Sequence, residues 1–182
     1  MGHKHSVYDS DTHFSISAIT RAIKNESSKK TTLIQGDHNS ERFSFDLPRF
    51  IEGHDMMNCN LVEVHFTNKD EQTGDINKDN YEVKDMQISP SDSNIIVFSW
   101  LIDERATLLA GLLEFQIKFK CMTGGVCDYK WNTAINSEIS IASALDNSGE
   151  VVESTPNVVD LWRSEIFGYA ENAGANINQA EQ

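Results

Sequence analysis

Alternating hydrophobic and polar positions run through much of the chain. In residues 113–119 every second side chain is Leu, Phe or Ile, and the positions between them hold Glu, Gln and Lys. The same period of two appears in residues 43–47 and 61–66. Because successive side chains of a strand point to opposite faces, this pattern predicts strands with one buried face and one solvated face.

Short segments rich in β-branched and aromatic residues bring the prediction to about nine strands. Besides residues 43–47 and 61–66, the candidates are residues 14–23, 31–35, 81–88, 95–102, 112–121, 127–133 and 135–144, and residues 112–121 include the alternating segment 113–119. Turn-rich segments such as 68–80, 89–94 and 122–126 separate them and leave little room for crossover helices. We therefore expect an all-β fold, an antiparallel, jelly-roll-like β-sandwich.

The pattern changes near residue 150. After a polar turn, apolar side chains recur at helical spacing, and Thr155 and Pro156 fit the N-cap and first position of a helix. We predict a sandwich domain over residues 1–150, and a linker with a C-terminal helix, the start of a stalk, over 151–182. The apolar stripe either folds back or docks on copies of the chain, through Val158, Leu161, Trp162, Ile166 and Phe167.

The charge balance narrows the choice of partners. With 15 basic and 28 acidic residues the formal net charge is -13, which repels phosphate backbones and anionic lipids. No segment approaches the roughly 18 apolar residues of a membrane helix. The start also lacks the apolar region of a signal peptide. We expect neither nucleic acid nor membrane as a partner, and synthesis in the cytoplasm without export through a signal peptide.

Motifs for catalysis are missing or incomplete. GxSxG is absent, and the SxxK pattern at residues 27–30 lacks its companion SDN and KTG motifs. Asp103 and Glu104 are neighbours that point to opposite faces of a strand, which does not suit a glycosidase pair. We expect no enzymatic activity, no catalytic residues and no cofactor.

Metal-site patterns are also incomplete. The six histidines have no HExxH spacing and no cysteine joins them. Asp75, Asn77 and Asp79 resemble the start of a calcium loop, but Asn80 and Met86 stand where the loop needs Gly and Glu. A solvated hairpin loop accounts for these residues, so we expect no metal site.

Three cysteines, Cys59, Cys121 and Cys127, form no CxxC motif and support neither a disulfide framework nor a zinc site. Cys121 and Cys127 flank the turn-like residues 122–126 and are placed to face each other across a hairpin. Reduced thiols in strands are the other interpretation. Pairing of these two cysteines stays open at this point.

Aromatic residues offer a candidate for sugar binding. Tyr129 and Trp131, with Trp100 and Tyr81, would form a stacking platform if they shared an exposed face. Aromatic residues in strands belong to the core more often. Tyr129 and Trp131 are our candidate glycan contacts.

Beside this pattern, several blocks of the chain resemble a known family, that of phage baseplate upper proteins and tail-fibre-like proteins in phages of Gram-positive bacteria. The first block, residues 37–55, ends in Pro48-Arg49-Phe50-Ile51-Glu52-Gly53-His54-Asp55. Three later blocks follow in the same order, at residues 81–85, 98–107 and 131–133. The similarity covers roughly residues 6–168 and rests on the combination and order of strand and turn motifs.

The resemblance implies a β-sandwich that attaches a fibre or receptor-binding arm to the tail tip, in several copies and often three. It implies a homo-oligomer, a trimer by preference, other tail or baseplate proteins as partners, and a place in the virion. It supplies no catalytic residues. The alternative is a carbohydrate-binding module that recognises host cell-wall polysaccharide.

Overall fold

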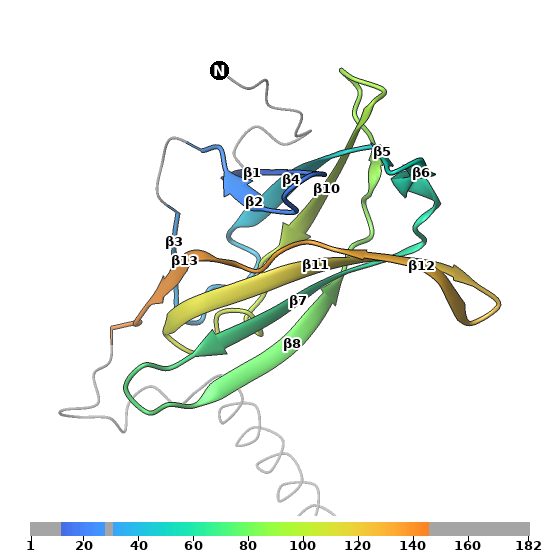
Figure 1. Cartoon of the computed structure of the whole chain (residues 1–182). Helices are drawn as coiled ribbons and strands as arrows, with labels where there is room; N and C mark the ends of the chain where they lie inside the picture. Colours follow the sequence, from blue (N-terminus) through green and yellow to red (C-terminus); the bar gives the residue numbers. More distant parts are fainter. Residues whose placement is uncertain (1–11, 28–30, 146–182) are drawn as a thin grey trace, which may run out of the picture. The chain divides into compact units, whose positions relative to one another are not determined.

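The chain folds into a nearly all-β body in the computed structural model, which describes residues 12–27 and 31–145 (Figure 1). Two main sheets and one short hairpin contain all the strands of this part. Its only helical element is a single 3-10 turn, η1 (Met56–Asn58). No helix of the described ranges is long and apolar enough to cross a membrane.

The first sheet has five strands, with β4 at its centre. In spatial order they are β2 (Ile23–Asn25), β1 (Thr12–Ile16), β4 (Arg42–Pro48), β10 (Ile95–Leu101) and β9 (Gln87–Ile88). β4 and β10 pair antiparallel along their whole length, with Phe45 opposite Phe98.

The second sheet has six strands and is organised around β11 (Gly111–Thr123). Its path runs β3 (Thr32–Ile34), β13 (Asn136–Ala142), β11, β7 (Leu61–Lys69) and β8 (Ile76–Glu82), while β12 (Val126–Asn132) also pairs with β11. β7 follows one edge of β11, and β13 and β12 share the other. Where these two meet, Thr133 Oγ accepts a hydrogen bond from the Ile117 amide at 2.9 Å.

The predicted alternation is confirmed in the core. The inward side chains of β4, β7 and β11 are almost completely buried, and they meet across the two sheets. The Phe115 ring of β11 lies 5.9 Å from Phe14 of β1 and 6.1 Å from Phe45 of β4. Trp100 of β10 stacks on Phe66 of β7 at 5.3 Å. The two sheets therefore pack face to face over one shared aromatic core.

The expectation of purely antiparallel pairing is wrong for two strand pairs. β1 runs parallel to β4, and β3 runs parallel to β13. The chain leaves the first sheet after β2, adds β3 to the second sheet and returns to the first sheet at β4. Because these connections cross between sheets, the hairpin rule that makes neighbours antiparallel does not apply to them.

Several strand boundaries also differ from the prediction. Residues 14–23 form no single strand: β1 and β2 are a hairpin, closed by the bond from the Ser17 amide to the Ala22 carbonyl at 3.0 Å. Residues 68–80 are not one long loop, because β7 continues to Lys69 and β8 starts at Ile76. β8 is an edge strand with no fully buried residue, so it lacks the apolar period that marks a strand in sequence.

The predicted boundary near residue 150 and the C-terminal helix lie outside the described residues. The same holds for the proposed interface residues Val158, Leu161, Trp162, Ile166 and Phe167. These stay predictions.

Candidate interaction surface

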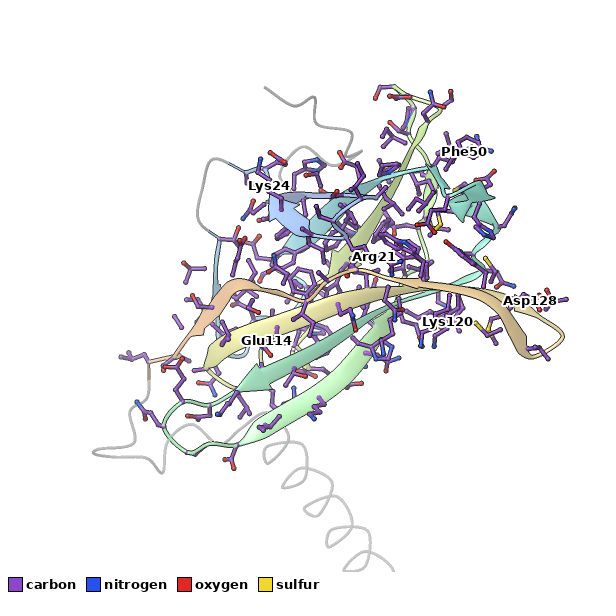
Figure 2. All side chains as sticks on the ribbon, in the orientation of Figure 1. Arg21, Lys24, Phe50, Glu114, Lys120 and Asp128 are labelled. Carbon is purple, nitrogen blue, oxygen red and sulfur yellow. The ribbon has the colours of Figure 1, made fainter. Side chains whose placement is uncertain are left out.

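A projecting hairpin, the arm, is formed by residues 121–129 of β11 and β12. The last pair between β7 and β11 is Leu61 with Lys120, and beyond it β11 pairs only with β12. Gly124 and Gly125 close the arm with φ values of 56° and 82°, as a two-residue type I′ turn requires. The arm extends past the sheet, with Asp128 near its end (Figures 1 and 2). Its Val126 side chain is 63% exposed.

A second, smaller hairpin lies beside the base of the arm. β5 (Phe50–Ile51) and β6 (His54–Asp55) are joined by Glu52 and Gly53, which both have positive φ. Sequence reasoning missed this hairpin, although Gly53 was a usable turn signal. The Phe50 side chain is 54% exposed and lies on this hairpin (Figure 2).

Arg49 and Asp55 brace the smaller hairpin. The Arg49 guanidinium donates to both carboxylate oxygens of Asp55, with Nη2 to Oδ2 at 2.8 Å and Nε to Oδ1 at 3.1 Å. Asp55 Oδ1 also accepts from the Met57 amide at 3.0 Å and so caps η1. The Arg49 guanidinium, with the smaller help of the Met57 amide, holds the pKa of Asp55 below its ordinary value.

Three contacts join the smaller hairpin and η1 to the arm. The His54 ring stacks on Tyr129 with centroids 3.9 Å apart. The Asn60 side chain donates to the Met122 carbonyl at 2.9 Å and accepts from the Met122 amide at 2.8 Å. The third contact is between two cysteine sulfurs. We call residues 49–60 together with the arm the corner.

The cysteine contact joins a different pair from the one that the sequence left open. Cys121 Sγ lies 2.9 Å from Cys59 Sγ, and Cys127 is exposed with its sulfur 3.4 Å from the Tyr129 carbonyl oxygen. The two-residue turn pairs Cys127 with Met122, and a register shift beyond it places Cys121 opposite Tyr129. The hairpin itself was predicted correctly, but its register separates the two cysteines that flank the turn.

The candidate glycan contacts lie at the base of the arm. Trp131 is only 2% exposed, packs on Phe119 at 5.8 Å and is covered by the Arg21 guanidinium at 5.1 Å. Tyr129 is half-buried under His54, and burial, together with the nearby carboxylate of Glu52, raises the pKa of its hydroxyl. The two residues share a face, but Trp131 belongs to the core. The two rings therefore do not form the exposed platform that would favour sugar stacking. Glycan binding through Tyr129 and Trp131 stays a prediction.

The outer face of the second sheet carries a shallow groove of about 660 Å³. Its lining residues are Thr67, Lys69, Glu71, Ile76, Lys78, Leu112 and Glu114. Further along this face Lys120 Nζ lies 2.8 Å from Glu63 Oε2. Lys120, and to a lesser degree His65, hold the pKa of Glu63 below its ordinary value. The groove itself is lined by Lys69, Lys78, Glu71 and Glu114 among others, so its lining carries charges of both signs.

Residues weighed as metal or acid–base groups have structural partners instead. Asn77 donates to Asn68 Oδ1 at 2.9 Å and to the Arg105 carbonyl oxygen at 2.6 Å. Asp79 and Asp103 both pair with the Arg105 guanidinium. In the part of the chain that the structure describes, no group of three or more His, Cys, Asp or Glu residues is placed to hold a metal ion.

Comparison with known proteins finds likeness in structure but not in sequence. No protein-family model and no curated protein sequence matches the chain. Among solved structures, the chain is similar to the N-terminal domain of phage TP901-1 ORF48, with a TM-score of 0.41 and 10% identity, covering 72% of this chain and 98% of that one. A likeness at this level carries no functional conclusion.

Proposed function

We propose that the chain is a structural component of a phage or prophage tail tip that assembles as an oligomer and links a receptor-binding arm to the tail. The observation that carries the proposal is the position in the fold of residues 37–55, the block that resembles tail proteins. Residues 37–55 contain both β4, the central strand of the first sheet, and the braced β5–β6 hairpin of the corner. The resemblance therefore falls on residues that build the body and its surface, and not on a catalytic constellation.

The corner has the properties of a surface that docks on other subunits. Phe50 and Val126 expose more than half of their side chains, on hairpins with two-residue turns. The Arg49–Asp55 pair and the Asn60–Met122 bonds hold these hairpins in one conformation. Preorganisation of this kind lowers the entropy that binding must overcome. The proposed partners are copies of the chain, a trimer by preference, and other tail or baseplate proteins.

We further propose that the protein has no catalytic activity, no cofactor, and neither nucleic acid nor membrane as a partner. The support is the net charge of -13 and the lack of a nucleophile or paired-acid motif in the sequence. The proposed location is the virion tail tip, after synthesis in the host cytoplasm.

Immunoelectron microscopy tests the location. Antibodies raised against the chain are applied to purified particles of a phage or induced prophage that encodes it, with mass spectrometry of the same particles. Label at the tail tip is expected. Particles that lack the protein, or carry label only on the capsid, would contradict the proposal.

Light scattering tests the assembly. The full chain is expected to be a trimer, and a chain that ends at Ser154 is expected to be a monomer, because the truncation removes the predicted apolar stripe. Circular dichroism of the truncated chain checks that the sheets remain folded. A monomer in both cases would reject helix-driven assembly and favour the alternative below.

The alternative is a carbohydrate-binding module. The groove of about 660 Å³ on the outer sheet face favours it, since sugar sites are concave. The lining contains no aromatic ring for sugar stacking. Calorimetry with purified cell-wall polysaccharide tests it: binding that Glu114→Ala abolishes and Lys84→Ala preserves would support this function, because Lys84 is not among the groove residues.

A further inference from the structure

Two thiols from distant parts of the chain meet at the corner. Cys59 and Cys121 are 62 residues apart in sequence, yet their sulfur atoms lie 2.9 Å apart. Cys59 is 2% exposed and lies between η1 and β7, whereas Cys121 is half-buried at the base of the arm. Nothing in the sequence indicated this pair.

The backbones that carry the two thiols are held on both sides of the contact. The reciprocal Asn60–Met122 hydrogen bonds, at 2.8 and 2.9 Å, join the residues that follow each cysteine. The Cys59 amide donates to the Met56 carbonyl at 3.1 Å. On the other side, Lys120 is paired with Leu61 in the β7–β11 ladder. The two sulfurs therefore meet in the folded protein without any rearrangement of the sheets.

We propose that Cys59 and Cys121 form an intramolecular disulfide when the folded protein meets a low-molecular-weight disulfide such as glutathione disulfide. The bond ties the base of the arm to the segment that follows η1. Cys127 takes no part in this bond, because its sulfur faces the Tyr129 carbonyl oxygen and the arm's register places it opposite Met122.

The chemistry is two successive thiol–disulfide exchanges. The Cys121 thiolate attacks one sulfur of glutathione disulfide, that S–S bond breaks, and one glutathione thiolate leaves. The Cys59 thiolate then attacks Cys121 Sγ in the mixed disulfide and releases the second glutathione. The two protons of the cysteine thiols end on two glutathione thiols, and glutathione gains the two electrons that the protein loses.

The order of attack follows from exposure. Burial, together with the neighbouring Cys121, raises the pKa of the Cys59 thiol, which disfavours its thiolate. Cys121 is the more accessible of the two and meets the oxidant first. Once the mixed disulfide has formed, the contact between the sulfurs makes the second step intramolecular.

The proposed function predicts when the Cys59–Cys121 disulfide forms. A tail protein passes from the reducing cytoplasm to an oxidising exterior when particles are released. This timing rests on the proposed function, whereas the pairing of the two cysteines does not.

Thiol counting on the full chain tests the pairing. The folded protein is equilibrated in glutathione disulfide, quenched with acid, unfolded, alkylated and weighed. We expect neither Cys59 nor Cys121 to be alkylated, and a peptide map that joins the two, while the exposed Cys127 is alkylated or carries one glutathione. Cys127→Ser should keep the bond and leave no free thiol, and Cys121→Ala should abolish it. Three free thiols after oxidation, stable glutathione adducts on Cys59 or Cys121, or a Cys121–Cys127 bond would each overturn the proposal.

Thermal melting checks that the bond belongs to the native fold. A cross-link that closes a long loop should raise the melting temperature by roughly 10 °C on oxidation, because it restricts the unfolded chain. The shift is expected in the natural chain and in Cys127→Ser, and absent in Cys121→Ala, whose half-buried site tolerates the change better than Cys59. An oxidised form that melts at or below the reduced form would overturn the proposal. Absence of the protein from virions would reject the proposed function and leave these results unchanged.

Discussion

Gly111 occupies a position that no other residue can take without moving the sheet. Its φ is 128°, and a Cβ built on it would lie 2.1 Å from the carbonyl oxygen of Lys69. Lys69 is the last residue of β7, so the glycine lets the first residue of β11 approach the end of its neighbour. The close approach is backbone against backbone, and no rotamer change relieves it.

Gly111→Ala is therefore expected to destabilise the fold by about 3 kcal/mol, near the upper end for strain at one residue. Urea unfolding measures the loss. Gly74→Ala is the matched control, because Gly74 has a φ of 77° but an added Cβ would meet nothing within 4 Å. The control should lose about 1 kcal/mol. Equal losses of stability for the two variants would show that the contact with the Lys69 carbonyl does not cause the loss in Gly111→Ala.

Glu63 makes part of the stability dependent on pH. Lys120, the largest cause, and His65 hold the pKa of Glu63 below its ordinary value of 4.5. A carboxyl group whose pKa is lowered by folding stabilises the native state above its ordinary pKa. That stabilisation is lost as the pH falls through the lowered value.

Lys120→Met should reduce the loss of stability that acid causes. The natural chain should lose about 1 kcal/mol more than the variant between about pH 5 and pH 3, because Glu63 is then protonated away from Lys120. Chemical unfolding across this pH range measures the difference. Lys130→Met, at an exposed position of β12, should behave like the natural chain. An identical acid profile for Lys120→Met would contradict the role of the pair.

At the scale of elements, the corner depends on short hairpins in which only a few side chains are buried, Ile51 of β5 and Met56 of η1 among them. β5 and β6 have two residues each, and an isolated pair of this length is not stable in water. The Arg49–Asp55 ion pair, the cap on η1 and the His54–Tyr129 stack add to the burial of these two side chains in holding the corner together. Removing these contacts should therefore loosen the corner without unfolding the sheets.

Asp55→Ala removes both the ion pair and the helix cap. Hydrogen exchange at the amides of β5, β6 and η1 should become about ten-fold faster, which corresponds to about 1.4 kcal/mol, while exchange in β4 and β11 stays unchanged. Asp46→Ala, a carboxylate on β4 outside the corner, is the comparison variant. Faster exchange throughout both sheets would show that the corner is part of the cooperative core.

At the scale of the whole molecule, assembly has two candidate surfaces: the predicted apolar stripe around Trp162 and the corner around Phe50. Trp162→Ala should weaken self-association at least ten-fold and leave the sheets folded, because the stripe follows the last strand. Sedimentation measures the association and circular dichroism the fold. If this variant unfolds, the stripe belongs to the core and is not an interface.

Phe50→Glu tests the corner separately. It should weaken binding to copies or tail partners with little change in melting temperature, because Phe50 is 54% exposed and buries little in the free chain. Ile19→Glu, at a side chain that is 93% exposed and lies in the β1–β2 turn, should leave association intact. Equal effects of the two variants would point to a general charge effect and not to a docking surface.

The sequence by itself determined the strands whose two faces meet different environments. Residues 43–47, 61–66 and 113–119 were predicted correctly, because a half-buried strand alternates its own apolar and polar residues. The all-β class and a hairpin turn within residues 122–126 followed from equally local signals.

Only the tertiary structure decided which strands are neighbours and which side chains meet. The parallel pairs at β1–β4 and β3–β13, the polar edge strand β8 and the burial of Trp131 depend on contacts between segments far apart in sequence. The same holds for the corner, where the hairpin register pairs Cys127 with Met122 and Cys121 lies against Cys59. A periodic pattern records whether a face is buried, but not what buries it, and the choice of partner is a property of the whole chain.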